Sequence, residues 1–306
     1  MSQNKNVHVL LALAITPVHA GVGQQFGAVD LPVQRDTMDY PIIYSSSFKG
    51  ALKNECVKRL SEIECSNNKP CRAKEDGKCR KLFGSDASPN EGMGSVTVTD
   101  LRLLFIPARS AEKGPIYLTT RYMLDSALEL LNLTDSSDLK GALELLRSKD
   151  SSSVQGSSAQ TSEPKVSVMG IADVPLRDIS KSALSNLFTD SKLYQSLISS
   201  GVAVADNSIS GADSSILVNR ALIRITRNRL DLLKKTVAKN SLWTEEYIPQ
   251  GSVFIAVAME NKMKTDEASS QTASGDSFEG VFGRGFYLNL GGKETIGRGL
   301  LRVVVR

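Results

Sequence analysis

The stretch TPVHAGVGQQFGAVDLPVQRDTMDYPIIYSSSFKGALK, from Thr16 to Lys53, decides how the rest of the chain is organised. It follows an apolar run, Val7 to Ile15, whose length is typical of one buried β-strand. It begins with a glycine-rich segment, where the backbone can bend closely around another molecule. Its end returns to apolar residues, and three serines then offer hydroxyl groups that can cap a helix beginning near Phe48. The expected order is strand, loop and helix.

Two side chains of the glycine-rich segment can take part in chemistry, His19 and Asp30. The free amides at the start of the following helix, together with Lys49, suit a phosphate group. The working hypothesis is therefore an acid in a flexible loop beside a phosphate-binding helix start.

The composition is that of a globular protein. A chain of 306 residues, 41% of them hydrophobic, can bury a substantial core. The net charge of +4 is small, so local clusters of basic residues would have to bind any polyanion. The first apolar run has no basic n-region and no cleavage-like site, and it is too short to span a bilayer. We expect a cytoplasmic protein with no membrane partner.

The helix after the serines is expected to have one apolar face and basic residues elsewhere. The apolar residues at helical spacing are Phe48, Leu52, Cys56, Val57 and Leu60. The basic residues on the other sides are Lys49, Lys53, Lys58 and Arg59. The pattern alone fits both a solvated basic surface and a contact with a polyanion.

The four cysteines lie in or beside a polar, cationic insertion that we place at about 61–93. Cys65, Cys71 and Cys79 are candidate zinc ligands, but five and seven residues separate them, and structural zinc sites usually have close CxxC pairs. Reduced thiols are one alternative. A disulfide, as occurs in proteins of thermophiles, is another.

The middle of the chain is predicted to alternate strands, helices and loops. Apolar residues from Val96 to Phe105 alternate as in a strand, and Pro107 is expected to end it. Asp100 lies inside this strand, where an acid is usually a structural hydrogen-bond acceptor. Helical spacing predicts helices over 119–131, 138–146, 179–188 and 192–198, and small polar residues predict flexible loops over 148–164 and 265–277.

The second informative segment runs from Ser215 to Ile248. Its first part, Ile216 to Ile225, has the pattern of a strand. Between residues 220 and 239, seven cations accompany one acid, Asp231; they are Arg220, Arg224, Arg227, Arg229, Lys234, Lys235 and Lys239. This local excess favours contact with a phosphate backbone over an ordinary exposed strand and turn. Trp243 and Tyr247 can stack on bases or anchor a hairpin to its core.

Glycines crowd the C-terminal region before a final strand, Leu300 to Val305. The region fails as a Walker motif because Lys293 is followed by Glu294 and no glycine stands at the required distance upstream. The glycines can instead bring backbone amides close to an extended phosphodiester, with Lys293 and Arg298 supplying charge.

Separated blocks over almost the whole chain occur in an order that is characteristic of one family. They are TPVHAGVG (16–23), GAVDLPVQRD (27–36), PIIYSSSFKGALK (41–53), FG (83–84), VTDLRLLFIPAR (98–109), TEEYIP (244–249) and LNLGGKETIGRGLLRV (288–303). The ordered set resembles the RAMP superfamily of CRISPR-associated proteins, and within it the backbone subunit of the type III-B (Cmr) RNA-targeting effector complex. The cysteine insertion, the serine-rich tract and the turn Tyr44 to Ser47 depart from the family pattern.

This resemblance implies an α+β fold around a ferredoxin-like (RRM-like) core, with inserted segments and a protruding β-hairpin called the thumb. We expect a single domain over 1–306, with the thumb at about 220–248. The implied partners are CRISPR RNA, a complementary single-stranded target RNA, copies of the chain and other subunits of the complex. Copies stack along the guide, each thumb displaces one nucleotide, and the subunit cuts the target at regular intervals.

The resemblance also assigns roles to individual residues. The family's cleavage aspartate lies in the loop matched by Gly27 to Asp30, so Asp30 is the expected catalytic residue. The expected RNA contacts are His19, Lys49, Lys53, Arg224, Arg227, Lys293, Thr295 and Arg298.

The chemistry of RNA cleavage fits a single acid. RNA carries its own nucleophile, the 2′-hydroxyl, so a nuclease needs only to bring one nucleotide into an in-line geometry and to stabilise charge. Asp30, ionised at neutral pH, can orient that hydroxyl or contact a divalent cation. One carboxylate is too few for an all-protein cage, so we expect Mg²⁺ or Mn²⁺ held partly by RNA phosphates. The expected products are a 2′,3′-cyclic phosphate and a 5′-hydroxyl.

Two other functions stay open on the sequence. The chain can be a catalytically silent guide-binding scaffold. It can also be a guide-processing endonuclease of the same superfamily, with His19 as general base.

Overall fold

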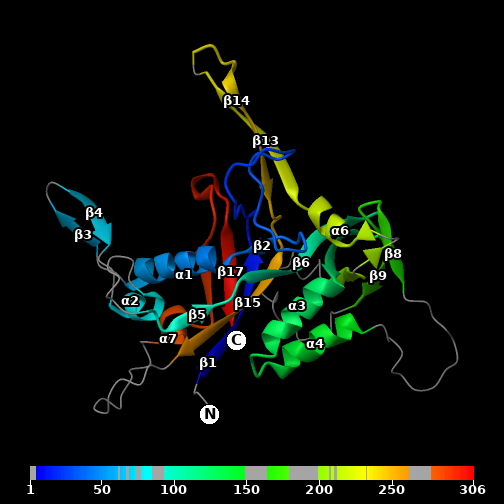
Figure 1. Ribbon diagram of the computed structural model, residues 1–306, viewed down its shortest axis with the longest axis horizontal. Helices are drawn as coiled ribbons and strands as arrows, with labels where there is room; N and C mark the ends of the chain where they lie inside the picture. The colour runs from blue at the N-terminus through cyan, green and yellow to red at the C-terminus, as the bar shows by residue number, and fades with distance from the viewer. Residues whose placement is uncertain are drawn as a thin grey trace.

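The central strand of the fold is β1 (Lys5–Ala14), as the first apolar run predicts (Figure 1). The structure is a computed structural model, and it describes residues 5–60, 63–66, 69–73, 77–84, 93–148, 164–178, 199–206, 208–209, 212–231, 233–261 and 277–306. Leu10 and Ala12 of β1 belong to one hydrophobic cluster, and Val9 and Leu11 belong to a second cluster on the opposite face. A strand covered on both faces has no polar side, which explains its continuous apolar sequence.

Most of the described strands join one sheet of eleven strands. Its main path is β16-β17-β1-β15-β6-β7-β10-β9-β8, while β2 pairs with β6 and β5 with β15. Their bounds are β2 (Ile42–Ile43), β5 (Val96–Val98), β6 (Leu101–Ser110), β7 (Gly114–Thr120), β8 (Lys165–Val168), β9 (Ala172–Arg177), β10 (Val202–Ala205), β15 (Val253–Asn261), β16 (Gly285–Asn289) and β17 (Leu300–Val305). The pairs are antiparallel except for β7 with β10.

The register of β1 determines which loops meet. Leu13 is opposite Val253 at the start of β15, and Ala14 is opposite Leu301 near the start of β17. Because both pairs are antiparallel, the segment that leaves β1 lies beside the segments that enter β15 and β17. Three parts of the chain that are far apart in sequence therefore converge at one end of these strands.

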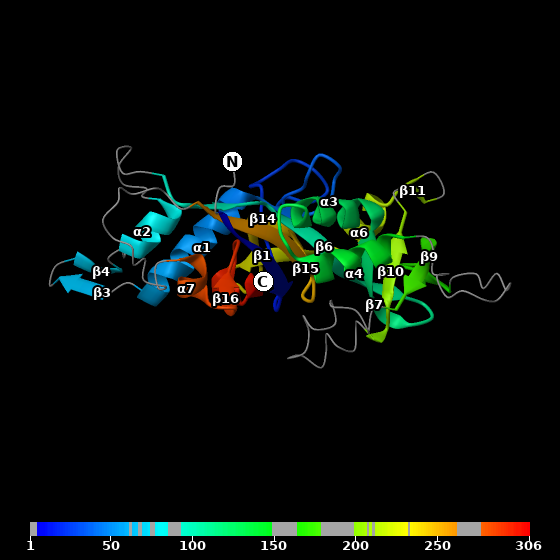
Figure 2. The same ribbon diagram turned by 90° about the horizontal axis from the view of Figure 1, so that it is seen from below.

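Helices pack against both hydrophobic clusters. Figures 1 and 2 show α1 (Ser45–Leu60), α2 (Gly77–Phe83) and α7 (Phe278–Phe282) around one half of the sheet, and α3 (Arg121–Leu131) and α4 (Ser137–Arg147) around the other. The Thr120 hydroxyl caps α3 by accepting a hydrogen bond from the amide of Met123. The remaining short elements are β3 (Ile63–Ser66), β4 (Lys69–Ala73), β11 (Ser208–Ile209), β12 (Ala212–Asp213), α6 (Ser215–Arg220) and the 3-10 helix η3 (Glu294–Ile296). No helix among the described residues is long and apolar enough to cross a bilayer.

Two sequence expectations about the strands are wrong. Pro107 does not end β6, which continues to Ser110. Pro107 is opposite Tyr117, whose N–H donates to Gly201 instead, so a residue without an N–H breaks no bond of this pair. The expected strand at 216–225 begins with the helix α6, because a short apolar run fits a buried helix as well as a strand.

The α+β class predicted from the sequence is confirmed, and so are the helices at 45–60, 121–131 and 137–147. The expected helices at 179–188 and 192–198 lie outside the described residues, as do nearly all of the loops at 148–164 and 265–277. The single-domain assignment and the ferredoxin-like core stay predictions.

The structure shows the bonding of two of the four cysteines. Cys56 of α1 and Cys79 of α2 form a disulfide with a sequence separation of 23, and both side chains are buried. Cys79 therefore has no free thiolate for zinc, which removes one of the three candidate ligands. The side chains of Cys65 and Cys71 lie outside the described part of the chain.

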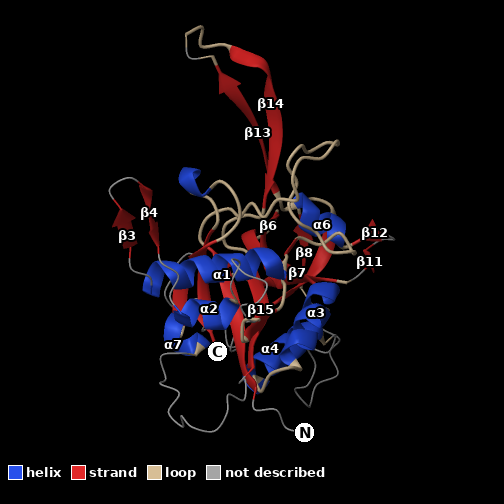
Figure 3. Ribbon diagram, turned by 60° about the vertical axis from the view of Figure 1, so that its left-hand side comes forward, coloured by secondary structure: helices blue, strands red, loops and turns tan. Residues whose placement is uncertain are grey.

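A two-stranded hairpin projects from the sheet (Figure 3). It consists of β13 (Ile223–Leu230) and β14 (Val237–Tyr247), paired from Ile223 opposite Tyr247 outward. Large hydrophobic side chains at its outer end are exposed, whereas Tyr247 at its foot is fully buried. The foot leads directly into β15, at the end of the sheet where the three segments converge.

Candidate nucleic-acid interface

The foot of the hairpin, the loop after β1 and the turn before β17 form one cluster of charged side chains. Figure 1 shows the blue segment between β1 and β2 beside the start of the yellow hairpin. Leu31 makes a parallel bridge to Glu245, Val18 makes an antiparallel bridge to Ile248, and the amide of Gly292 donates to the carbonyl of His19. The segment that carries Asp30 is thus joined to the hairpin by an isolated parallel bridge at Leu31.

Asp30 is held by the backbone of the hairpin. Its Oδ2 accepts a hydrogen bond of 2.7 Å from the amide of Thr244, and the next amide, of Leu31, donates to the carbonyl of Thr244. Its Oδ1 has no hydrogen-bond partner among the residues that the structure describes. The residue is partly exposed, so the carboxylate is fixed in place and still accessible.

Two adjacent glutamates of β14, which the sequence reading did not select, form the centre of the cluster. Glu245 and Glu246 are 0% and 1% exposed. Lys293 and Arg227 pair with Glu245 at 2.7 and 3.6 Å. Burial opposes ionisation of Glu245, but hydrogen bonds from Lys293, Trp243 and Tyr247 outweigh that effect and lower its pKa to about 2. Glu245 is therefore a buried carboxylate that stays ionised.

Glu246 connects the loop after β1 to the hairpin. Its Oε2 accepts from Arg35 at 2.8 Å and from the amide of Val33 at 3.3 Å, while its Oε1 accepts from Arg224 at 3.2 Å. Its amide donates to the carbonyl of Leu31. The sequence held a signal for both glutamates. They directly precede the apolar residues Tyr-Ile-Pro, so the strand that buries those residues also carries the two acids toward the core.

Basic side chains surround the two glutamates at the hairpin foot. Four cations contact the two buried glutamates, namely Arg35, Arg224, Arg227 and Lys293, and their side chains are 22% to 49% exposed. Arg35 also reaches the exposed Asp39 at 3.1 Å. The sequence pattern set Arg224 and Arg227 against Asp231 alone, whereas in the structure each pairs with a buried glutamate. Their contact with RNA stays a prediction. The exposed parts of the four cationic side chains are suited to contact with a polyanion.

His19 is a buried linker in this arrangement. Its side chain is 7% exposed, and its Nδ1–H donates to the carbonyl of Glu246 at 2.7 Å. A Cβ on Gly21 would lie 2.7 Å from His19 Nε2, so this position needs glycine for lack of space. The ring of His19 packs against Tyr247, over which Arg298 lies at 5.1 Å from the ring centre. An RNA contact by His19 stays a prediction, and the observed role of the imidazole is structural.

The glycine-rich turn before β17 packs on protein. The amides of Gly292 and Gly299 donate to the carbonyls of His19 and Pro17, and those of Ile296, Gly297 and Arg298 donate within the turn. These amides are not free for a phosphodiester, contrary to the sequence expectation. Gly291 has φ +88°, and a Cβ there would lie 2.4 Å from the carbonyl oxygen of His19. Of the residues expected to contact RNA, Thr295 is exposed, whereas Lys293 and Arg298 are partly exposed.

The start of α1 differs from the expected phosphate site. Asp100 Oδ1 accepts a hydrogen bond of 2.6 Å from the amide of Ser45, so an acid already caps this helix. The prediction that Asp100 is a structural acceptor is confirmed, and the amide of Ser45 is therefore not free for a phosphate. Phosphate binding at this helix start stays a prediction. Lys49 and Lys53 lie partly exposed on α1, next to the buried Phe48 and Leu52.

The described residues contain no group of three or more His, Cys, Asp or Glu that could hold a metal ion. At the hairpin foot, the carboxylates of Glu245 and Glu246 are occupied by cations. Of the carboxylates of Asp30, Glu245 and Glu246, that of Asp30 alone has an oxygen without a partner among the described residues. The donor set fits a single contact to a divalent cation whose other ligands come from RNA phosphates and water.

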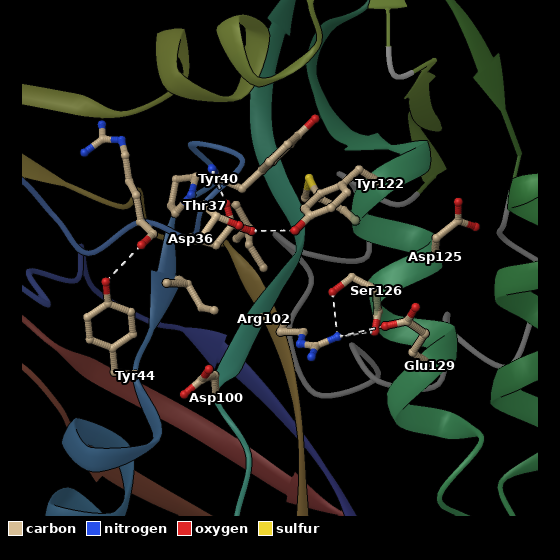
Figure 4. A pocket seen from close by; sticks show the side chains of 15 residues that line it. Asp36, Thr37, Tyr40, Tyr44, Asp100, Arg102, Tyr122, Asp125, Ser126 and Glu129 are labelled. Atoms are coloured by element: carbon tan, nitrogen blue, oxygen red, sulfur yellow. Dashed lines mark hydrogen bonds and ion pairs between the residues drawn. The ribbon is translucent and has the colours of Figure 1, made fainter.

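A separate pocket of about 470 Å³ lies between the segment after Asp30 and α3 (Figure 4). Within it, Tyr122 donates to Asp36 Oδ2 at 2.9 Å, and burial and this bond raise the pKa of Tyr122 to about 12. Arg102 donates to Ser126 and pairs with Glu129 at 3.6 Å. None of the residues predicted to cut or bind RNA lines this pocket, although Arg35 is shared with the hairpin foot. Other polar groups of its lining have partners outside it, as Asp100 does with Ser45 and Asp125 with Arg147, and we assign the pocket no ligand.

The chain is similar to a known family over nearly its full length. The model of the RAMP superfamily matches residues 12–302. One relative is the CRISPR system CMR subunit Cmr4 of Saccharolobus solfataricus, 29% identical over 95% of this chain and 93% of that protein. Another is the CRISPR system Cmr endoribonuclease Cmr4 of Pyrococcus furiosus, 25% identical over 95% of this chain and 93% of that protein.

Solved structures show the same likeness. A chain of the type III-B Cmr-beta complex, solved by cryo-electron microscopy with cognate target RNA, is 26% identical, with a TM-score of 0.70 over 98% of this chain and 97% of that chain. The crystal structure of oligomeric Cmr4 from Pyrococcus furiosus has a TM-score of 0.56 at 21% identity, over 99% of both chains, which shows a shared fold.

Proposed function

The chain belongs to the RAMP superfamily, and from this we propose that it is a guide-binding backbone subunit of a type III-B CRISPR effector complex and an endoribonuclease. In this role it binds CRISPR RNA, stacks with copies of itself, assembles with other subunits and cleaves target RNA complementary to the guide. The likeness to Cmr4 subunits, one named as an endoribonuclease, supports this proposal. The likeness to a chain solved with target RNA supports the same partners.

One observation carries the enzymatic part of the proposal. Asp30 is a partly exposed carboxylate that the backbone of the projecting hairpin holds in place, beside four partly exposed basic side chains. A phosphodiester attracted to these cations would bring a ribose next to a fixed carboxylate oxygen. We further propose that the hairpin is the thumb of the family and that the chain forms a single domain around a ferredoxin-like core.

The mechanism follows from the positions of these groups. The hairpin displaces one target nucleotide from the paired strand, which allows its 2′-oxygen to align with the phosphorus and the leaving 5′-oxygen. Asp30 Oδ1 accepts the hydrogen of the 2′-hydroxyl while Thr244 holds Oδ2. The 2′-oxygen bonds to phosphorus, the bond from phosphorus to the 5′-oxygen breaks, and that oxygen takes up a proton. A 2′,3′-cyclic phosphate and a 5′-hydroxyl result.

A divalent cation is part of the proposal. Asp30 is the residue that would contact Mg²⁺ or Mn²⁺, and the ion would neutralise charge on the scissile phosphate. Chelation is therefore expected to stop cleavage without releasing the guide, and added Mg²⁺ or Mn²⁺ is expected to restore it. Cleavage at an unchanged rate in excess chelator would remove the cation from the mechanism.

The decisive experiment uses the complex reconstituted with guide RNA. Asp30→Asn is expected to lower single-turnover cleavage of complementary RNA by about 100-fold or more while target binding persists. Asp39→Asn is the matched control, because Asp39 is an exposed aspartate of the same segment with φ +63°, a conformation that asparagine tolerates. Unchanged cleavage by Asp30→Asn would leave a guide-binding scaffold. The processing alternative finds less support, because His19 is buried and its Nδ1 is engaged; it requires that the isolated chain cut repeat RNA.

A further inference from the structure

Phe26 stands uncovered in the loop that carries Asp30. Its side chain is fully exposed, at 107% of the reference area, although burial of a phenylalanine ring is strongly favourable. The amide of Gln25 donates to the carbonyl of Asp30 at 2.9 Å, which closes a turn that contains Phe26. The following Gly27 and Ala28 have little or no side chain to cover the ring. The fold therefore presents an aromatic face a few residues from the fixed carboxylate.

The surroundings of Phe26 favour a nucleic acid as its partner. The segment 21–29 (GVGQQFGAV) has no charged side chain, so nothing on it repels a polyanion. The chain continues through Asp30 to Leu31, which bridges to Glu245, the partner of Lys293 at the hairpin foot. A protein interface would bury a contiguous apolar patch. Over 16–41, the exposed large hydrophobic side chains besides Phe26 are Val22 and Met38, at 41% and 48%. A nucleobase, in contrast, can stack on a single exposed aromatic ring without a surrounding apolar patch.

Resting on the function proposed above, we propose that Phe26 is a base-stacking residue for the target nucleotide whose ribose lies at Asp30. A displaced nucleotide has lost stacking neighbours in its own strand, and the phenyl ring replaces one of them. Because every base has a π-face, the contact selects no particular base. Its effect is to orient the ribose for cleavage, with little effect on the binding of the whole paired target.

Photocrosslinking tests the contact without cleavage. The complex is assembled with Asp30→Asn and a target that carries 5-iodouridine at the displaced position, and irradiation joins this base to a stacked aromatic side chain. The crosslinked peptide is expected to contain residue 26, and Phe26→Ala is expected to abolish the crosslink. The same probe at a paired position is the control. A crosslink that maps to another segment and survives Phe26→Ala would overturn the proposal, whatever Asp30 does.

Kinetics test the consequence with Asp30 intact. Phe26→Ala and Phe26→Leu are expected to lower single-turnover cleavage about tenfold, while Phe26→Tyr and Phe26→Trp stay within about twofold of the unmodified chain. Val22→Ala, on the same loop, is expected to cleave normally. Equal activity of Leu and Trp at position 26 would contradict stacking. Loss of assembly between copies in Phe26→Ala, with crosslinking absent, would mean that the ring contacts protein instead.

Discussion

Thr244 contacts Asp30 through its backbone alone, which allows its main chain and side chain to be tested separately. Its N–H donates to Asp30 Oδ2, while its hydroxyl lies 3.5 Å from that of Thr226 on β13. Thr244→Pro removes the donor, and because this N–H is directed at Asp30 rather than at β13, it removes no bond between the strands. Thr244→Ala removes only the hydroxyl.

We expect Thr244→Pro to lower single-turnover cleavage by about 10- to 100-fold, the value of a hydrogen bond to a charged group. Thr244→Ala is expected to cleave normally. Melting temperatures of the two variants identify any general loss of folding. Equal losses of activity in both variants would show that the amide does not position the carboxylate.

The lowered pKa of Glu245 predicts how the free energy of unfolding depends on pH in acid. Its pKa in the folded chain is about 2, below the ordinary value of 4.5. A lowered folded pKa stabilises the protein above the unfolded pKa, and this stability is lost as the pH falls from about 4.5 toward about 2. The stability lost over this whole pH range is on the order of 3 kcal/mol. Glu245→Gln should therefore lack this portion of the pH dependence.

The measurement is the free energy of unfolding in denaturant at several pH values, for the unmodified chain and for Glu245→Gln. The two curves should approach each other as the pH falls from 4.5 to about 2. Parallel curves over that range would show that the cations do not hold Glu245 ionised.

The disulfide between α1 and α2 is expected to stabilise the fold, and this can be tested. Cys56 and Cys79 are buried against each other and close a loop with a sequence separation of 23. A crosslink of this length typically stabilises the folded state by about 3 kcal/mol. Reduction should lower the free energy of unfolding by that order, and the double variant Cys56→Ala with Cys79→Ala should show the lower stability without reductant. An unfolding midpoint that is the same with and without reductant would mean that the disulfide is not formed.

The sequence predicts the strands of the hairpin but not how the hairpin packs on the rest of the protein. The alternating β-branched and basic residues of β13 predict a strand, and the register from Ile223 opposite Tyr247 makes a hairpin of it. An isolated two-stranded hairpin is marginally stable. Here the buried Tyr247 and the ion pairs of Glu245 and Glu246 fix the foot, and the outer end extends without a core. Tyr247 is thus an anchor, the second of the two interpretations that the sequence allowed.

At the scale of the whole molecule, guide binding should depend on salt through a few exposed cations. Lys49 has no ion pair with a described residue, whereas Arg224 and Arg227 also neutralise buried glutamates. Lys49→Gln is therefore the cleaner test. It should weaken guide binding for all sequences and reduce the slope of log affinity against log salt by about 1. Lys140→Gln, on α4, should change neither quantity, and a base-specific loss with Lys49→Gln would contradict contact with the backbone.

The sequence predicted the elements whose signals are local. The apolar run of β1, the amphipathic patterns of α1, α3 and α4 and the strand pattern of β13 all depend on neighbours a few residues away. Ordered motifs also indicated the family, which the match over residues 12–302 confirms. Pro107 and the segment 216–222 were read wrongly because strand pairing and burial, which are not local, determined their conformation.

By itself the sequence determined the α+β class and the superfamily, and it indicated the loop in which we propose that an acid acts. Only the tertiary structure decided that Asp30 is held by Thr244, that Glu245 and Glu246 are buried hubs, and that His19 and the glycine-rich turn support the site from within. The reason is the antiparallel register of β1 with β15 and β17, which brings residues more than 200 positions apart into contact. Local periodicity fixes an element, but charge pairing and burial across such distances depend on how the strands align.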